Sequence, residues 1–184
     1  MLNNDLSQQI KRNFPYKPTE EQENAVKSFA EFLFSPSADS VFLMKGYAGT
    51  GKTTLTSALV RTLDSLQRKV ILLAPTGRAA KVFSGYAEHP AYTIHKKIYR
   101  QKVFSNETDN FVANQNLHRN TLFIVDEASM IANEGLSGGH FGSGRLLDDL
   151  VQYVYNGLGC RLMLIGVNLP IFIPSCFGFD FFIK

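Results

Sequence analysis

Residues 41–56 constrain the fold of this chain most, because they place a glycine-rich turn between a strand pattern and a helix pattern. The stretch begins with an apolar run that contains β-branched and aromatic side chains, which is typical of a buried strand. It continues into Gly46-x4-Gly51-Lys52-Thr53, the pattern of a phosphate-binding loop, or P-loop. Apolar residues then recur at helical spacing from Leu55 to Leu66. Strand, glycine-rich loop and helix in this order indicate a nucleotide site, and a plain glycine turn is the alternative.

Each residue type in this loop suits the binding of phosphate groups. Glycines let the backbone curl so that several amide groups point at phosphate oxygens, and a helix N-terminus adds partial positive charge. Lys52 can reach the β- and γ-phosphates, and the Thr53 hydroxyl can ligate Mg²⁺. The loop residues that we predict to bind the nucleotide are Gly46, Ala48, Gly49, Thr50, Gly51, Lys52, Thr53 and Thr54.

Composition is that of one globular domain with a sizeable core. The chain has 184 residues, of which 45% are hydrophobic and 19% are charged, and its net charge of +3 says little about partners. Two cysteines, Cys160 and Cys176, form no metal or disulfide framework and fit a reducing compartment. The first residues carry no signal-peptide pattern, and no stretch approaches the length of a membrane span. We therefore expect a cytoplasmic protein without membrane contact.

Three further apolar runs, at residues 69–74, 121–125 and 161–165, read as buried strands. Helical patterns separate the runs, including one at residues 145–155, so we predict right-handed crossovers. The predicted fold is an α/β domain with a mainly parallel sheet between two layers of helices. Ligands of such sheets bind at the carboxyl ends of the strands, which makes the residues after each run candidate site residues.

The other segments are less regular. Residues 1–18 are polar, and we expect them to wrap the surface. Thr19-Glu-Glu-Gln22 has the spacing of a capping box, which predicts the start of a helix. Residues 101–120 are expected to form a loop or a hairpin, within an insert at 85–120. Five glycines predict a flexible loop at residues 133–144.

An acidic pair follows the strand at residues 121–125. Mg²⁺ prefers carboxylates and water, so Asp126 can hold it opposite Thr53, while Glu127 can orient and deprotonate an attacking water. A solvated turn is the alternative, but a P-loop NTPase needs such an acid. We therefore predict Lys52 and Glu127 as catalytic residues and Thr53 and Asp126 as metal ligands.

Basic and aromatic residues alternate between positions 76 and 102, where six basic side chains stand against one acidic residue, Glu88, a local net charge of +5. Basic groups can follow a phosphate backbone, and aromatic faces can stack on unpaired bases. The alternative is a solvated basic face with its aromatic side chains in the core. His95 has no partner evident in the sequence, and a structural or phosphate-contacting role suits it better than catalysis. The interleaved aromatic residues are Phe83, Tyr86, Tyr92 and Tyr99.

Taken together, several segments resemble RecD-like superfamily 1 DNA helicases in sequence and in order. The resemblance covers residues 14–166 and implies the first RecA-like motor domain of such an enzyme. A P-loop alone would indicate only an NTPase, and the segments at 74–81 and 126–130 are the specific ones. The segments are Thr19-Glu-Glu-Gln22, Gly46-Tyr-Ala-Gly-Thr-Gly-Lys-Thr53, Ala74-Pro-Thr-Gly-Arg-Ala-Ala-Lys81, Thr93-Ile-His95 and Asp126-Glu-Ala-Ser-Met130.

This resemblance implies roles for matching residues. Gln22 would recognise adenine, which makes ATP the nucleotide. Asp126 would bind Mg²⁺, directly or through water, and Glu127 would activate the attacking water. Two motor domains of such helicases close on ATP and open after hydrolysis, which moves the enzyme along the strand, generally 5′ to 3′. The residues expected to contact single-stranded DNA are Pro75, Thr76, Gly77, Arg78, Lys81, Thr93, His95 and Lys96.

The resemblance ends after the fourth strand. The family pattern there is similar to Gly-Asp-x-x-Gln-Leu-Pro-Pro, whereas this chain reads Gly166-Val-Asn-Leu-Pro-Ile171, without the acid and the glutamine. We therefore divide the chain into a motor domain at 1–166 and a divergent apolar tail at 167–184, which holds five phenylalanines among its last thirteen residues. The favoured interpretation is a truncated or frame-altered helicase that lacks its second motor domain and can associate through the tail.

From such a chain alone we expect nucleotide binding, weak ATP hydrolysis and no processive unwinding. In the alternative interpretation, the tail supplies one more core strand of a compact single-domain ATPase. Two other functions stay open: a nucleotide- or DNA-binding fragment without significant catalysis, and a small P-loop ATPase or kinase that does not act on nucleic acid.

Overall fold

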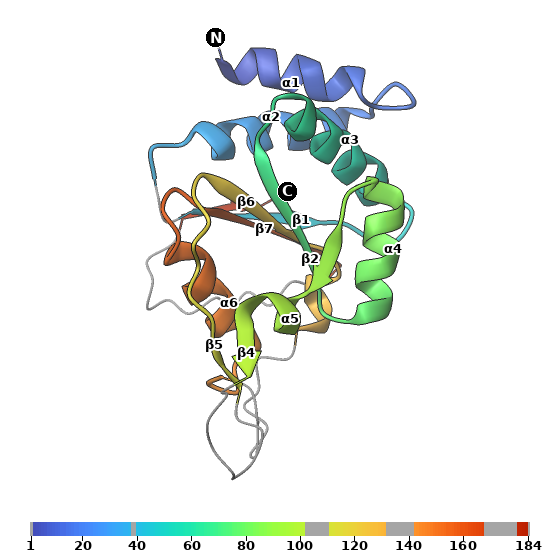
Figure 1. Cartoon of the computed structure of the whole chain (residues 1–184). Helices are drawn as coiled ribbons and strands as arrows, with labels where there is room; N and C mark the ends of the chain where they lie inside the picture. The colour runs from blue at the N-terminus through green and yellow to red at the C-terminus, as the bar shows by residue number, and fades with distance from the viewer. Residues whose placement is uncertain (1, 38–39, 102–110, 132–141, 168–179, 184) are drawn as a thin grey trace, which may run out of the picture.

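A parallel sheet lies at the centre of the molecule, with helices on both of its faces (Figure 1). The computed structural model describes residues 2–37, 40–101, 111–131, 142–167 and 180–183. The sheet has the strand order β3-β2-β6-β7-β1-β8, and every neighbouring pair is parallel. Its strands are β1 (Ser40–Lys45), β2 (Lys69–Ala74), β3 (Ala91–Thr93), β6 (Thr121–Val125), β7 (Arg161–Gly166) and β8 (Asp180–Ile183).

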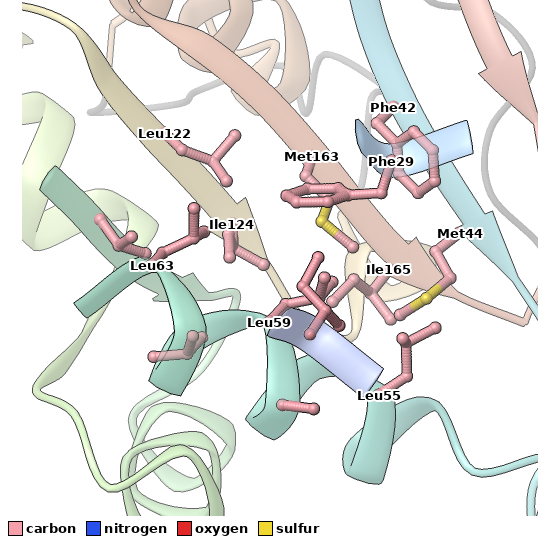
Figure 2. Close-up of a cluster of buried hydrophobic side chains, with 14 of the residues drawn as sticks. Phe29, Phe42, Met44, Leu55, Leu59, Leu63, Leu122, Ile124, Met163 and Ile165 are labelled. Atoms are coloured by element: carbon pink, nitrogen blue, oxygen red, sulfur yellow. The ribbon is translucent and has the colours of Figure 1, made fainter. Parts of the chain in front are cut away.

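Helices cover the sheet in two layers, because both faces of the strands are apolar. One face of the sheet and helices α1 to α4 form one hydrophobic cluster, part of which is shown in Figure 2. The other face packs against α5 and α6. Side chains alternate along a strand, so Phe42 and Met44 belong to the first cluster while Val41 and Leu43 belong to the second. The predicted three-layer α/β fold is confirmed. The helices are α1 (Leu2–Arg12), α2 (Glu20–Phe34), α3 (Lys52–Ser65), α4 (Gly77–Ala87), α5 (Ile94–Ile98), the 3₁₀ turn η1 (Ala128–Met130) and α6 (Leu146–Tyr155).

A small antiparallel hairpin projects from this body. Strand β4 (Tyr99–Gln101) pairs with β5 (Phe111–Ala113), so the hairpin interpretation of the region after residue 100 is correct for its described strands. The Oδ2 atom of Asp149 in α6 accepts hydrogen bonds from Tyr99 Oη of β4 at 2.6 Å and from Ser143 N, just before α6, at 2.9 Å. Asp149 therefore links the hairpin to the start of this helix. Of the predicted glycine loop at 133–144, only residues 142–144 lie within the described ranges.

The N-terminal segment differs from the sequence prediction, which expected residues 1–18 to wrap the surface. Residues 2–12 instead form helix α1, which buries Leu6 and Ile10 in the first hydrophobic cluster. These two residues stand four positions apart and so share one face of the helix, a stripe too narrow to show in a polar composition. Lys11 Nζ lies 2.6 Å from Glu23 Oε2 of α2, a hydrogen bond that lowers the pKa of Glu23.

The C-terminal end of the chain contributes a strand. Residues 180–183 form β8, which pairs with β1 from Ser40 to Leu43 at the edge of the sheet. This is the additional strand of the single-domain alternative, although residues 168–179 lie outside the described ranges. The boundary between a domain at 1–166 and a tail at 167–184 stays a prediction.

In the part of the chain that the structure describes, no helix is long and apolar enough to cross a membrane.

Packing of α1 can be tested at its most buried residue. Ile10 is 0% exposed, so Ile10→Ala removes buried methyl groups and leaves a cavity. We expect it to lower the free energy of unfolding by about 2–5 kcal/mol in urea denaturation. Gln8→Ala, at an exposed position of the same helix, is the control and should stay within about 0.5 kcal/mol of wild type. Equal, small effects of both changes would show that α1 does not pack as described.

Candidate functional site

The P-loop connects β1 to α3 and closes around the ammonium group of Lys52. Lys52 Nζ donates hydrogen bonds to the carbonyl oxygens of Gly46 and Tyr47, the latter at 2.8 Å. Thr50 Oγ1 also donates to the Tyr47 carbonyl oxygen, at 2.9 Å. Gly49 has a φ of 82°, in the left-handed region that glycine adopts without strain. The positive charge therefore lies in the centre of the loop, where an anion can take the place of the carbonyl partners.

Two loop glycines have close neighbours where a Cβ atom would lie. A Cβ atom on Gly46 would lie 2.7 Å from Thr50 Oγ1. Gly51 has a φ of 82°, and a Cβ atom there would lie 2.3 Å from Gln22 Nε2. Side chains at these positions would force the loop or Gln22 to move.

Gln22 reaches the P-loop from helix α2. The predicted capping box is confirmed: Thr19 Oγ1 accepts a hydrogen bond from Gln22 N at 3.3 Å, and Gln22 Oε1 accepts one from Thr19 N at 3.0 Å. Its Nε2 also donates to the Thr50 carbonyl oxygen at 3.4 Å. Gln22 lines a cavity of about 330 Å³ on this side of the loop, together with Glu21, Asn24, Ala25, Met44, Lys45, Gly46, Thr50, Gly51, Lys52 and Leu55.

The acidic pair lies on the other side of the loop. Strand β7 lies between β1 and β6, and Gly46 N donates to the Gly166 carbonyl oxygen at 3.3 Å, so the ends of these strands meet at one edge of the sheet. This edge holds a cavity of about 410 Å³ between the P-loop and the acids. The cavity therefore brings together all four residues predicted to be catalytic or to bind metal. Its lining residues are Ala48, Gly49, Gly51, Lys52, Thr53, Asp126, Glu127, Gly166 and Val167.

Both carboxylate oxygens of Asp126 accept hydrogen bonds. Oδ1 accepts one from Glu127 N at 2.9 Å, and Oδ2 accepts one from Tyr86 Oη at 2.6 Å. Burial, and then the neighbouring charge of Asp126, raise the pKa of Tyr86, so this phenol stays protonated and donates. Glu127 is exposed and has a φ of 54°, which turns the chain away after the strand.

These residues fit Mg²⁺ and a nucleotide phosphate. No group of three or more His, Cys, Asp or Glu side chains that could hold a metal is found within the described ranges. Mg²⁺ does not need such a cage, because it is commonly held by one or two carboxylates together with substrate phosphates and waters. The Thr53 hydroxyl and the Asp126 carboxylate line the same cavity as the loop, and they are the groups that could hold it. Thr54 lies half-buried in the first turn of α3 and lines neither cavity.

The residues expected to contact DNA follow two neighbouring strands. Thr76 caps α4 after β2, and its Oγ1 accepts a hydrogen bond from Ala79 N at 3.2 Å. Thr93 caps α5 after β3 in the same way, with Lys96 N as the donor at 3.2 Å. Because β2 and β3 are adjacent and parallel, the segments at 75–81 and 93–96 begin at the same edge of the sheet. Thr76, Gly77, Arg78, Lys81 and Lys96 are exposed, and Pro75, Thr93 and His95 are half-buried.

His95 carries little positive charge at neutral pH. Burial lowers its pKa, and its ring lies 5.8 Å from the ring of Tyr99. Protonation therefore requires a lower pH than for an exposed histidine, so a hydrogen bond or a packing role suits it better than a charge contact.

Most of the interleaved aromatic side chains cannot stack on bases. Phe83 and Tyr99 are buried, and Tyr86 is stacked on Phe83 with its hydroxyl on Asp126. Only Tyr92 of this group is exposed, and the Lys97 ammonium lies 5.8 Å from its ring centre. The base-stacking interpretation is therefore wrong for three of the four, and no pattern in the sequence indicates the contact of Tyr86 with Asp126.

Comparison with known proteins finds similarity over most of this region. A family described as an AAA domain matches residues 17–138. Over 164 residues the chain is 27% identical to an uncharacterised protein of Methanocaldococcus jannaschii, covering 83% of this chain and 14% of that protein. Over 140 residues it is 30% identical to the multifunctional conjugation protein TraI of Escherichia coli K12, covering 68% of this chain and 8% of TraI. Over 90 residues it is 37% identical to the ATP-dependent DNA helicase dda of Enterobacteria phage T4, covering 47% of this chain and 20% of the helicase. The chain therefore spans a small part of the length of these relatives.

Crowding at Gly51 allows a test of the site. Gly51→Ala strains the left-handed backbone and places a methyl group against Gln22, so we expect affinity for a fluorescent ADP to fall more than about tenfold. Gly85→Ala is the control, because Gly85 lies in α4 with open space around its Cα, and alanine favours a helix. Binding measured by fluorescence anisotropy should be unchanged in the control. Unchanged binding by Gly51→Ala would contradict the role of the loop.

Proposed function

Because this chain belongs to the AAA domain family, we propose that it is an ATP-binding and hydrolysing motor domain of a DNA helicase, of the RecD-like branch of superfamily 1. The observation that carries the proposal is the cavity in which Lys52 and Thr53 face Asp126 and Glu127. The relationship over 90 residues to a protein named as an ATP-dependent DNA helicase supports it.

Each part of the cavity has a role in hydrolysis. The P-loop amides and the Lys52 ammonium bind the β- and γ-phosphates of ATP, and Gln22, which lines the second cavity, contacts the adenine base. Thr53 and Asp126 hold Mg²⁺, which neutralises the charge of the phosphates when bound. Glu127 is exposed toward the same cavity and accepts a proton from the attacking water.

We propose that hydrolysis by this chain alone is slow. None of the described residues that line the phosphate cavity is an arginine. An arginine supplied from another domain or subunit accelerates phosphoryl transfer by about 10³–10⁵ in related chemistry. Translocation from 5′ to 3′ and unwinding would therefore depend on a second motor domain.

Single-stranded DNA is the proposed partner of the basic surface at the ends of β2 and β3. Arg78 and Lys81 lie exposed on α4, and Lys96 lies exposed on α5. Backbone amides and hydroxyls at the start of both helices can contact phosphates, as helix N-termini commonly do. Because most aromatic side chains here are buried, the contact we propose is mainly electrostatic.

One observation favours a second candidate, a nucleotide-binding fragment without significant catalysis. Val167 lines the phosphate cavity directly after β7, where the resembling family carries an acid. An apolar side chain there cannot orient a water or sense a phosphate through a hydrogen bond. Measurement of ATP turnover distinguishes the two candidates.

Turnover in the presence of single-stranded DNA tests the proposed function directly. We expect slow hydrolysis of Mg²⁺-ATP that rises when an oligonucleotide is added, and we expect Lys52→Ala to reduce it to background because the loop loses its cation. Lys69→Ala removes an exposed lysine from the opposite end of the sheet and should leave turnover unchanged. Binding without turnover would favour the fragment, and turnover that is unaffected by DNA would favour an ATPase that does not act on nucleic acid.

Salt dependence tests the DNA surface. For single strands the slope of log affinity against log salt concentration is about −0.7 per phosphate neutralised. We expect the double variant Arg78→Ala/Lys81→Ala to make the slope shallower by about 1.4, measured by filter binding at several salt concentrations. Lys17→Ala/Lys27→Ala removes the same charge from exposed positions outside the proposed surface and should change the slope little. Equal effects of the two pairs would show that only the total charge matters.

A further inference from the structure

Tyr86 lies in the site although it belongs to neither the P-loop nor the acidic pair. It occupies the last turn of α4 (Gly77–Ala87), the helix whose first turn carries the proposed DNA contacts. Its hydroxyl donates a hydrogen bond to Asp126 Oδ2 at 2.6 Å, the short distance that is typical of a hydroxyl on a carboxylate. Helix α4 is thereby attached to the proposed metal ligand.

Two further contacts fix the position of this hydroxyl. The Tyr86 ring is stacked on Phe83, with ring centres 5.1 Å apart and an angle of 26° between the planes. Phe83 is 0% exposed, so the ring is packed against the core. Ser57 Oγ of α3, the helix that follows the P-loop, donates to the Tyr86 carbonyl oxygen at 2.8 Å. The backbone of Tyr86 is thus bonded to the P-loop helix, while its side chain is bonded to Asp126.

The effect on Asp126 is to fix the plane of its carboxylate. Glu127 N holds Oδ1 and Tyr86 Oη holds Oδ2, so rotation of the group would break one bond or the other. Each carboxylate oxygen has two lone pairs, which leaves one on each oxygen for a metal ion or a water bound to it. A partner of this kind commonly sets the orientation of a metal ligand and affects affinity for the metal.

We propose that Tyr86 is a positioning residue that orients Asp126 for Mg²⁺ and joins the metal side of the site to helix α4. This inference rests on the nucleotide- and metal-binding part of the proposed function, and it does not require DNA binding or hydrolysis. Tyr86→Phe removes the hydroxyl but keeps the ring on Phe83 and the backbone bond to Ser57. The variant therefore separates the hydrogen bond from the packing.

Affinity for a fluorescent ADP, measured with Mg²⁺ and in excess chelator, gives a readout that does not depend on turnover. The ratio of the two affinities reports how strongly the metal supports nucleotide binding. We expect Tyr86→Phe to reduce this ratio by about tenfold, the size found for residues that orient metal ligands, while affinity without Mg²⁺ stays the same.

Tyr155→Phe is the matched control. Tyr155 Oη also donates a hydrogen bond at 2.6 Å, to the Ser40 carbonyl oxygen at the start of β1, at the end of the strand opposite the P-loop. Tyr155→Phe removes a hydrogen bond of similar length outside the site. The ratio of ADP affinities with and without Mg²⁺ should therefore stay at the wild-type value.

A double-variant cycle tests whether Tyr86 acts through Asp126. In an Asp126→Asn background the carboxylate is already absent, so adding Tyr86→Phe should change the ratio by less than about twofold. A purely structural role would instead lower affinity equally with and without Mg²⁺, and it would do so in both backgrounds.

Several results would overturn the inference. A ratio for Tyr86→Phe that is unchanged or raised, or a full effect that persists in Asp126→Asn, would show that Tyr86 does not orient the carboxylate. Wild-type protein that binds ADP without any effect of Mg²⁺ would overturn it too, together with the metal part of the proposed function. Wild-type protein that binds no nucleotide would overturn both proposals. Wild-type protein that binds Mg²⁺-ADP but no single-stranded DNA would refute the helicase function. The role of Tyr86 would still be tested by the ratio of ADP affinities with and without Mg²⁺, because it does not require DNA binding.

Discussion

Parallel pairing of β1, β7 and β6 is the constraint on which the candidate site depends. Leu43 of β1 lies beside Leu164 of β7, which in turn lies beside Val125 of β6, so the three strands reach the same edge together. The P-loop begins at Gly46, directly after Lys45, which is paired with Gly166, and the acids begin directly after Val125. Because side chains alternate along a strand, a shift of one residue in this pairing would move side chains from each cluster to the other face of the sheet and disrupt the packing of both. The packing of the core therefore also fixes the distance between the loop and the acids.

Local patterns were sufficient to predict the parts of the site that lie close together in the chain. The glycines, Lys52 and Thr53 occur in one continuous motif, and the capping box at Thr19 is a contact between residues three positions apart. The fold class also followed, because buried strands of a parallel sheet appear as continuous apolar runs. Contacts between distant segments were not predictable in this way. The bond from Tyr86 to Asp126 joins residues forty positions apart, and the sequence offered only a tyrosine within a basic stretch. Helix α1 was missed because two buried residues, Leu6 and Ile10, are enough to dock a helix that is otherwise polar.

Gln22 shows how a residue can serve the fold and the site together. Its backbone and side chain complete the cap of α2, and its Nε2 contacts the P-loop. The left-handed backbone at Gly51 favours glycine, and this amide occupies the space where a Cβ atom would lie. A base bound in the cavity on this side would meet an amide whose position is already set by the cap, so less conformational entropy is lost on binding. The cap of α2 thus sets one wall of the cavity before any ligand arrives.

Helix α4 connects the two halves of the proposed function through its own backbone and one side-chain hydrogen bond. Its first turn is capped by Thr76 at the exposed basic surface, and its last turn reaches Asp126 through Tyr86. The first and last turns of this eleven-residue helix belong to one continuous hydrogen-bonded element. If a ligand displaced the first turn, the bond from Tyr86 to Asp126 would be the route by which the displacement reaches the metal side of the site. Coupling of this kind is reciprocal, so any effect of DNA on Mg²⁺-dependent nucleotide affinity must equal the effect of the Mg²⁺-nucleotide on DNA affinity.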